Sequence, residues 1–91
     1  MAQQYDNRND NIKIWINGKL LHRNEAKVSV FDSVVQGGDA VWEGIRVYKG
    51  KIFKLDEHVN RLMESAHTMD FSDIPSPAEV IAAIRETLIL N

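Results

Sequence analysis

Cysteine is absent from this chain of 91 residues, which excludes disulfide bonds, thiolate zinc sites and cysteine nucleophiles. Neither sign of charge is in large excess, because 11 basic residues stand against 13 acidic ones and the net charge is −2. The chain therefore has no basic field of the kind that attracts nucleic acid or an anionic membrane surface. No apolar run approaches the ~18 residues that a membrane-spanning helix needs. We expect neither nucleic acid nor a membrane as a partner.

Several sequence motifs of enzymes are missing as well. No metal-binding motif, Walker loop or Rossmann glycine set occurs, and Gly37-Gly38 alone is weak evidence for a phosphate-binding loop. The first residues, MAQQYDNRNDN, are polar and lack the apolar core of a secretory signal, so the default expectation is a cytoplasmic protein. We expect residues 1–11 to form a disordered leader. The composition of the chain is that of an ordinary soluble globular domain, with 44% hydrophobic and 26% charged residues.

Two hairpins are predicted from turn signals. Residues 12–16 alternate in polarity and lead into Asn17-Gly18, the strongest short hairpin signal, before a return strand over 19–22. A short extended piece is expected over 28–31. The longest strand is expected over 40–48, and the turn Lys49-Gly50 joins it to a strand over 51–54. Four strands joined by hairpins predict an antiparallel sheet.

Two helices are expected to follow the strands. The first begins near Asp56, a plausible N-cap, and has one apolar stripe with steps of four and three: Leu55, Val59, Leu62, Ala66 and Met69. In the second, Ser76-Pro77-Ala78-Glu79 is a capping box with proline at the first helical position. Its apolar residues are Val80, Ile84 and Leu88.

The predicted long strand carries the first group of candidate functional residues. One face holds Trp42, Gly44, Arg46 and Tyr48, and the other holds Val41, Glu43, Ile45 and Val47. The first face fits either a solvated surface with an exposed aromatic ring or the wall of a ligand pocket. Glu43 interrupts the apolar face, and the sequence does not identify its partner.

Arg61 is the second candidate, because its planar guanidinium suits a phosphate dianion. It lies one helical turn after His58 and one turn before Ser65. Chemistry alone favours a simpler interpretation, in which Arg61 forms an exposed ion pair with Glu57 at i−4.

Long, ordered blocks of the sequence resemble a known family. GGDAVWEGIRVYKGKIFKLDEHVNRL, from Gly37 to Leu62, and WINGKLLHRNEAKVSVFD, from Trp15 to Asp32, are similar to the start of class IV (fold-type IV) pyridoxal-phosphate aminotransferases. The resemblance runs from about Lys13 to Asn91. It implies that residues 12–91 are the small N-terminal α+β domain, an antiparallel sheet of hairpin-linked strands covered by two helices. It also implies that the large catalytic domain is absent from this chain.

The resemblance assigns roles to individual residues. Arg61 is the arginine of EHxxRL, which binds the phosphate of pyridoxal 5′-phosphate, and Trp42, Gly38 and Arg46 fall among substrate-binding positions. The lysine that forms the Schiff base with the cofactor belongs to the second domain. None of the six lysines matches it: Lys13, Lys19, Lys27, Lys49, Lys51 and Lys54. The chain thus carries no catalytic residue and is expected to be inactive alone.

The resemblance also implies the reaction and the partners. EGIR favours a branched-chain amino acid as the substrate, with 2-oxoglutarate as the expected amino acceptor. The family pattern as a whole implies a homo-oligomer. Gly37 stands where branched-chain enzymes often carry a tyrosine, so a D-amino acid aminotransferase or an aminodeoxychorismate lyase fragment stays open. A non-catalytic stand-alone domain that binds or dimerises is the alternative from another class.

Overall fold

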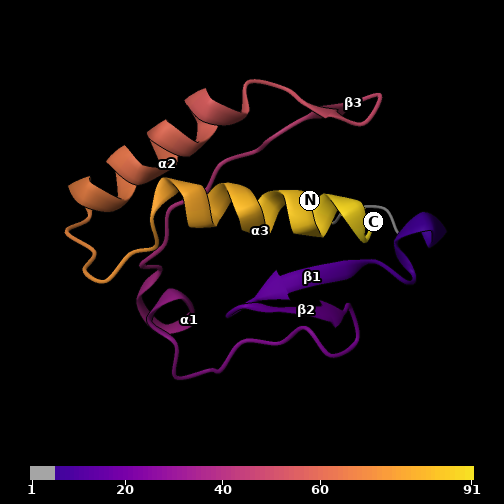
Figure 1. The fold of residues 1–91 in the computed structure, drawn as a ribbon. Helices are drawn as coiled ribbons and strands as arrows, with labels where there is room; N and C mark the ends of the chain where they lie inside the picture. Colours follow the sequence, from indigo (N-terminus) through magenta and orange to yellow (C-terminus); the bar gives the residue numbers. More distant parts are fainter. Residues whose placement is uncertain (1–5) are drawn as a thin grey trace. The chain divides into compact units, whose positions relative to one another are not determined.

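The computed structural model describes residues 6–91, which divide into two compact units. The first unit comprises residues 6–28 and 83–91, and the second comprises residues 29–82. Figure 1 labels the helices and strands of both units. Residues 1–5 of the predicted leader lie outside the described residues, and within the rest of it Asn7–Asn9 form a short 3-10 helix capped by Asp6.

The first unit contains the first predicted hairpin. β1 (Lys13–Ile16) pairs antiparallel with β2 (Lys19–His22), and Ile16 lies opposite Lys19 (Figure 1). The two turn residues have positive φ, 51° at Asn17 and 85° at Gly18, as a two-residue turn of this kind requires. The prediction of this hairpin from Asn17-Gly18 is confirmed.

The second unit contains the other hairpin, which is shorter than predicted. β3 (Val47–Tyr48) pairs with β4 (Lys51–Ile52) through Lys49 and Gly50, whose φ values are 49° and 78°. The predicted strand over 40–48 is wrong for residues 40–46, which are extended chain without a strand partner among the described residues. Only the Arg46 carbonyl continues the pairing, accepting a bond of 2.8 Å from the Phe53 amide. Burial nevertheless alternates from Val41 to Arg46 as the predicted period of two requires.

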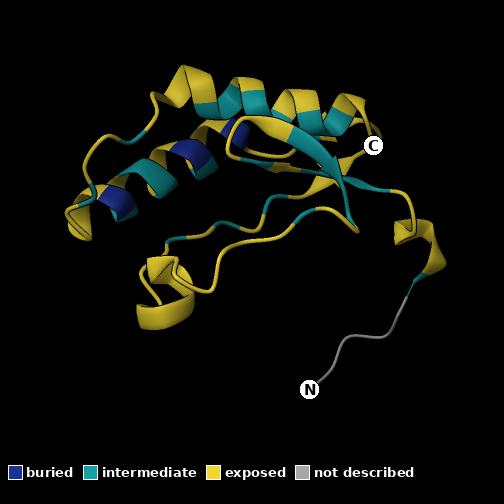
Figure 2. Cartoon of the chain, turned by 90° about the horizontal axis from the view of Figure 1, so that it is seen from below, coloured by how far each residue is buried: buried dark blue, intermediate teal, exposed yellow. Residues whose placement is uncertain are grey.

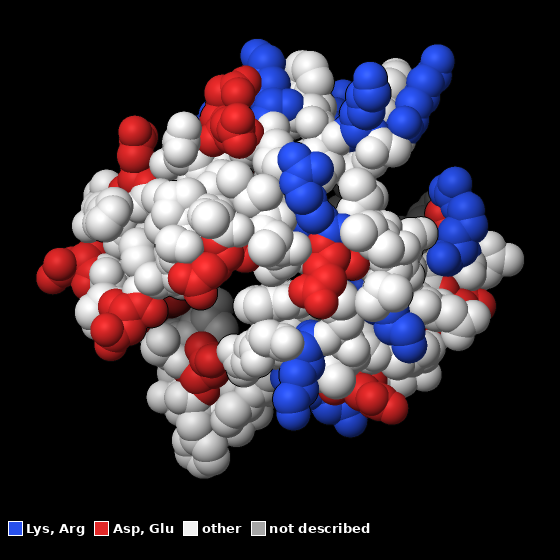
Figure 3. Space-filling view, in the orientation of Figure 1, with Lys and Arg blue, Asp and Glu red and all other residues white. Residues whose placement is uncertain are grey.

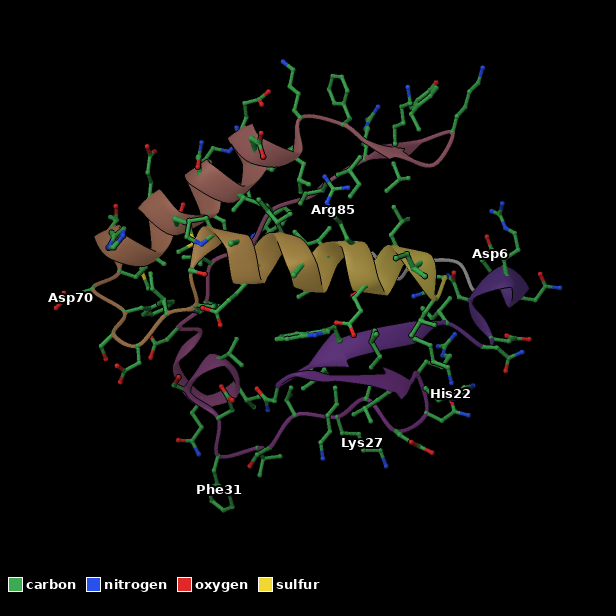
Figure 4. All side chains as sticks on the ribbon, in the orientation of Figure 1. Asp6, His22, Lys27, Phe31, Asp70 and Arg85 are labelled. Carbon is green, nitrogen blue, oxygen red and sulfur yellow. The ribbon has the colours of Figure 1, made fainter. Side chains whose placement is uncertain are left out.

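A short helix that the sequence analysis did not predict precedes this segment. α1 (Ser33–Gly37) begins after Asp32, whose side chain accepts a hydrogen bond from the Val34 amide. It ends at Gly38, which has a left-handed φ of 71°. An N-capping aspartate and a glycine after the last turn are the signals that would have located it. Residues 28–31 form no strand, and Phe31 is 83% exposed and projects away from the chain (Figure 4).

α2 (Leu55–Thr68) provides the buried residues of the second unit. Among the described residues, those classed as buried are Leu55, Val59 and Ala66, all of them on the predicted stripe of α2 (Figure 2). Asp56 is not the N-cap: the helix starts one residue earlier, Lys54 is the cap with a left-handed φ of 51°, and Asp56 lies in the first turn. There its negative charge interacts favourably with the positive end of the helix dipole.

α3 (Pro77–Ile89) begins as the sequence predicts. The Ser76 hydroxyl accepts a bond of 3.2 Å from the Glu79 amide, and the Glu79 carboxylate accepts one of 3.2 Å from the Ser76 amide. These reciprocal bonds satisfy two backbone donors that the helix itself leaves unpaired. The capping box is confirmed.

The α+β class with antiparallel hairpins is confirmed. The four strands pair as two separate two-stranded sheets, however, and not as a single sheet. Among residues 6–91, no helix has both the length and the apolar character needed to cross a membrane.

Candidate functional site

The candidate site lies within the second unit, where the extended segment before β3 meets α2. The β3–β4 hairpin reverses the chain, and α2 starts three residues after β4 ends. Glu43, in the segment before the hairpin, thereby reaches the side chains of His58 and Arg61 in α2. His58 and Arg61 are three residues apart, so they lie on the same face of the helix. We call Glu43, His58 and Arg61 the Glu43 cluster.

The Glu43 carboxylate is the centre of the cluster. Its Oε1 lies 2.7 Å from Nδ1 of His58 and accepts a bond of 2.7 Å from Nη2 of Arg61. Nε of Arg61 donates to both carboxylate oxygens at 3.1 Å. The Glu43 side chain is 12% exposed and that of His58 is 17% exposed, whereas that of Arg61 is 63% exposed. The largely enclosed Glu43, which His58 also contacts, thus holds one side of an arginine that remains open to solvent.

The chemistry of the carboxylate fixes which ring nitrogen of His58 carries a hydrogen. An ionised carboxylate can only accept, so Nδ1 of His58 donates to Glu43. Nη2 of Arg61 lies 3.2 Å from the same Nδ1, but both atoms are then donors and the contact is not a hydrogen bond. His58 and Arg61 therefore converge on one oxygen from two sides.

These contacts stabilise the ionised form of Glu43. Hydrogen bonds from Arg61, and after them the bond from His58, lower the pKa of the Glu43 carboxyl from 4.5 to about 2, against a smaller opposing effect of desolvation. The same bond from Glu43 raises the pKa of the Arg61 guanidinium. At neutral pH the cluster holds a carboxylate and a guanidinium as a charged pair.

Arg61 keeps part of its hydrogen-bonding capacity. A guanidinium has five N–H donors, and Glu43 occupies only those on the Nε and Nη2 side. Nη1 makes no hydrogen bond to any part of the chain that the structure describes. The free Nη1 and Nη2 edge is a planar fork that matches a phosphate or a carboxylate. The β3–β4 hairpin and the residues beside it carry further exposed cations, namely Arg46, Lys49, Lys51 and Lys54. Figure 3 shows lysine and arginine side chains over this hairpin, at the upper right.

The predicted substrate-facing residues are exposed. Trp42 is 82% exposed, and its ring lies beside Gly44, where an added Cβ would be 3.6 Å from Cζ3 of the ring. Arg46 is exposed, and its backbone belongs to the hairpin pairing. Gly38 is exposed at the end of α1, and its positive φ accounts for a glycine there without a ligand. Trp42 is linked to Arg61 only through its neighbour in the sequence, Glu43, which contacts Arg61.

Sequence reasoning selected Arg61 as a candidate but did not find its partner. The carboxylate that Arg61 contacts is Glu43, 18 residues before it, and not Glu57 at i−4. The signal for Glu43 was present, because a charged residue interrupted an otherwise apolar alternation. Nothing in the local spacing indicated that α2 would supply its partners.

Comparison with known proteins identifies the family. The sequence pattern of the family described as "Amino-transferase class IV" matches residues 40–91, which include the whole Glu43 cluster. "Branched-chain-amino-acid aminotransferase-like protein 1" of Arabidopsis thaliana is 57% identical over 83 residues, which are 91% of this chain and 15% of the relative. "Branched-chain-amino-acid aminotransferase-like protein 2" of the same plant is 53% identical over 83 residues, again 91% of this chain and 15% of the relative.

A bacterial relative is less similar. "D-alanine aminotransferase" of Bacillus licheniformis is 39% identical over 80 residues, which are 88% of this chain and 28% of the relative. The chain thus spans between 15% and 28% of the length of these three relatives. The matched family pattern covers more than half of the chain, and the chain belongs to the class IV aminotransferase family.

Proposed function

We propose that this chain contributes a phosphate-binding wall to a pyridoxal-phosphate-dependent aminotransferase, with Arg61 as the residue that contacts the cofactor phosphate. The observation that carries the proposal is the free fork of Arg61, fixed on its other side by Glu43 and 63% exposed. The reaction class, amino transfer, follows from membership of the aminotransferase family.

The residues present fit the phosphate end of such a cofactor. A dianion binds best to donors that are charged, planar and already oriented, and the fork of Arg61 has these properties. The cofactor, when bound, supplies the electron sink that makes amino transfer possible. The proposed part of this chain is to bind and orient the cofactor through Arg61.

Trp42 and Arg46 are the proposed substrate-side residues. An indole ring that is 82% exposed offers apolar area to a substrate side chain, and Arg46 offers a cation to a carboxylate. Gly38 is the third such position, at the exposed end of α1. The identities of 57% and 53% to proteins named for branched-chain amino acids favour a branched-chain substrate with 2-oxoglutarate as the amino acceptor.

A D-amino acid is the second candidate substrate. The 39% identity to a D-alanine aminotransferase supports it. The two candidates differ in the stereochemistry of the amino acid. A panel of L-branched-chain and D-amino acids, offered to the complete protein, separates them.

The chain alone is proposed to be inactive, and the complete protein to be a homo-oligomer in the cytoplasm. The chain spans a minor part of its relatives. The family resemblance implies that the lysine that holds the cofactor belongs to the second domain, so none of the six lysines is proposed for that role. Turnover of any amino acid and 2-oxo acid pair by the 91-residue chain, above the rate with cofactor alone, would contradict this.

Phosphate binding by Arg61 is tested with pyridoxamine 5′-phosphate, which has no aldehyde and so cannot react with surface lysines. We expect it to shift the Arg61 Nε–H signal in NMR titrations, whereas pyridoxamine, which lacks the phosphate, should not. Arg61→Gln should abolish the phosphate-dependent part of the binding. Arg85→Gln removes an equal charge from an exposed position of α3 and is the matched control. Equal binding by wild type and Arg61→Gln would refute the proposed role.

A further inference from the structure

We infer that Glu43 is the positioning residue of the phosphate site: it holds the Arg61 guanidinium side-on and so presents the Nη1 and Nη2 edge to the anion. The inference rests on the proposed phosphate role of Arg61 and adds a residue to it. It starts from a feature that the phosphate role by itself does not explain, namely that the phosphate-binding cation is already paired with a carboxylate.

Glu43 holds the Arg61 guanidinium along one edge, an arrangement that we call the clamp. Glu43 receives three hydrogen bonds from Arg61, and they all come from Nε and Nη2. Contact at two neighbouring nitrogens fixes the plane of the guanidinium, because the planar fork cannot rotate without breaking them. The side of the guanidinium that remains free is the one that a phosphate would meet.

Glu43 is itself held in place. It is 12% exposed, and His58, 17% exposed, donates from Nδ1 to the same oxygen that Nη2 of Arg61 contacts. His58 thus supports the carboxylate through a second donor, and Arg61 is the most exposed member of the cluster. A carboxylate that served only to neutralise a surface arginine would need no second donor of this kind.

The clamp has two opposite effects on anion binding. The carboxylate charge repels a phosphate, which weakens binding. Fixing the long arginine side chain before the anion arrives removes the entropic cost of ordering it, which strengthens binding by roughly three- to tenfold. We take the second effect to be larger, because the charge of Glu43 is already compensated by direct bonds from Arg61 and His58.

The test compares Glu43→Gln with Glu57→Gln. Both variants remove one negative charge, but Glu57 is exposed and makes no hydrogen bond to Arg61 in the described part of the chain. Because Glu43→Gln removes the repulsion as well as the preordering, we expect it to weaken binding of pyridoxamine 5′-phosphate by less than the full gain, about two- to threefold. Glu57→Gln should leave it unchanged or strengthen it slightly. Circular dichroism and the urea midpoint show whether each variant is folded.

A second readout reports on Arg61 without any ligand. A clamped guanidinium gives a sharp Nε–H signal protected from exchange with water, assigned by its absence in Arg61→Lys. We expect Glu43→Gln to broaden or remove this signal and Glu57→Gln to keep it. His58→Leu, which removes the other donor to Glu43, should broaden the signal to a smaller extent.

The outcomes separate the two claims. If Glu43→Gln binds the phosphate as well as wild type or better while Arg61→Gln does not bind, Arg61 keeps its role and the positioning role of Glu43 is overturned. If the Nε–H signal is unprotected in the wild-type chain, the clamp does not exist and the inference also fails. If pyridoxamine 5′-phosphate leaves the Arg61 signal unmoved at every concentration, the proposed phosphate role fails, and the positioning role fails with it.

Discussion

Val59→Ala tests whether the stripe of α2 is the core of the second unit. Val59 is 1% exposed, the lowest value among the three residues that are classed as buried in the described part of the chain. The substitution removes two methyl groups, worth ~1.6 kcal/mol at about 0.8 kcal/mol each. Incomplete collapse of the space left behind raises the expected loss to about 2 kcal/mol. A chain of this length is stabilised by only about 5–14 kcal/mol, so the loss is a substantial fraction.

Urea unfolding followed by circular dichroism at the helical wavelength measures this loss. With a slope of about 1–2 kcal/mol per molar urea, the midpoint should fall by about 1–2 M. Val30→Ala is the matched control, since it makes the same change in the same unit at a residue that is 67% exposed. Its effect should stay within about 0.5 kcal/mol. Equal losses in the two variants would show that α2 does not pack through Val59.

Two further predictions concern the Glu43 cluster and the start of α3. The pKa of Glu43 is lowered from 4.5 to about 2, so its pairing contributes stability above pH 4.5 that is lost as the pH falls toward 2. Urea midpoints of wild type and Glu43→Gln should therefore differ at neutral pH and converge in this acidic window; a gap that stays constant down to pH 2 would contradict the pairing. Ser76→Ala removes a hydrogen bond to the Glu79 amide and should cost about 1 kcal/mol, whereas Ser72→Ala, in the exposed loop before it, should cost little. Equal urea midpoints for these two serine variants would rule out the cap as a stabilising element.

The features that the sequence determined are those set by neighbouring residues. Asn17-Gly18 and Lys49-Gly50 have positive φ, and both hairpins form where these pairs occur. The capping box at Ser76 works over three residues, and α3 starts there. The steps of four and three in α2 placed Leu55, Val59 and Ala66 on its buried side. In each case the information lies in residues that are close together in the sequence.

Sequence reasoning went wrong where a local signal had a close competitor. Asp56 is a good capping residue, but the helix begins one residue before it because Lys54 takes the left-handed conformation. The alternation over 40–48 predicted a strand, and it produced the alternating burial without the hydrogen-bonded partner that defines one. The alternation of apolar and polar residues indicates which side chains of a segment are buried. It does not indicate whether another strand lies alongside and forms hydrogen bonds with it.

Only the tertiary structure decided the partner of Arg61. By spacing alone, Glu57 at i−4 was the nearest carboxylate, and a helix pair of that kind is worth ~0.2–0.5 kcal/mol. The chain reversal at β3–β4 instead returned Glu43, 12% exposed, to the same arginine, where three hydrogen bonds form in a partly enclosed place. Charge-assisted bonds that are shielded from water are stronger than an exposed pair, so the distant carboxylate prevails over the near one. A sequence shows which charges a chain carries, and the path of the backbone determines which of them meet.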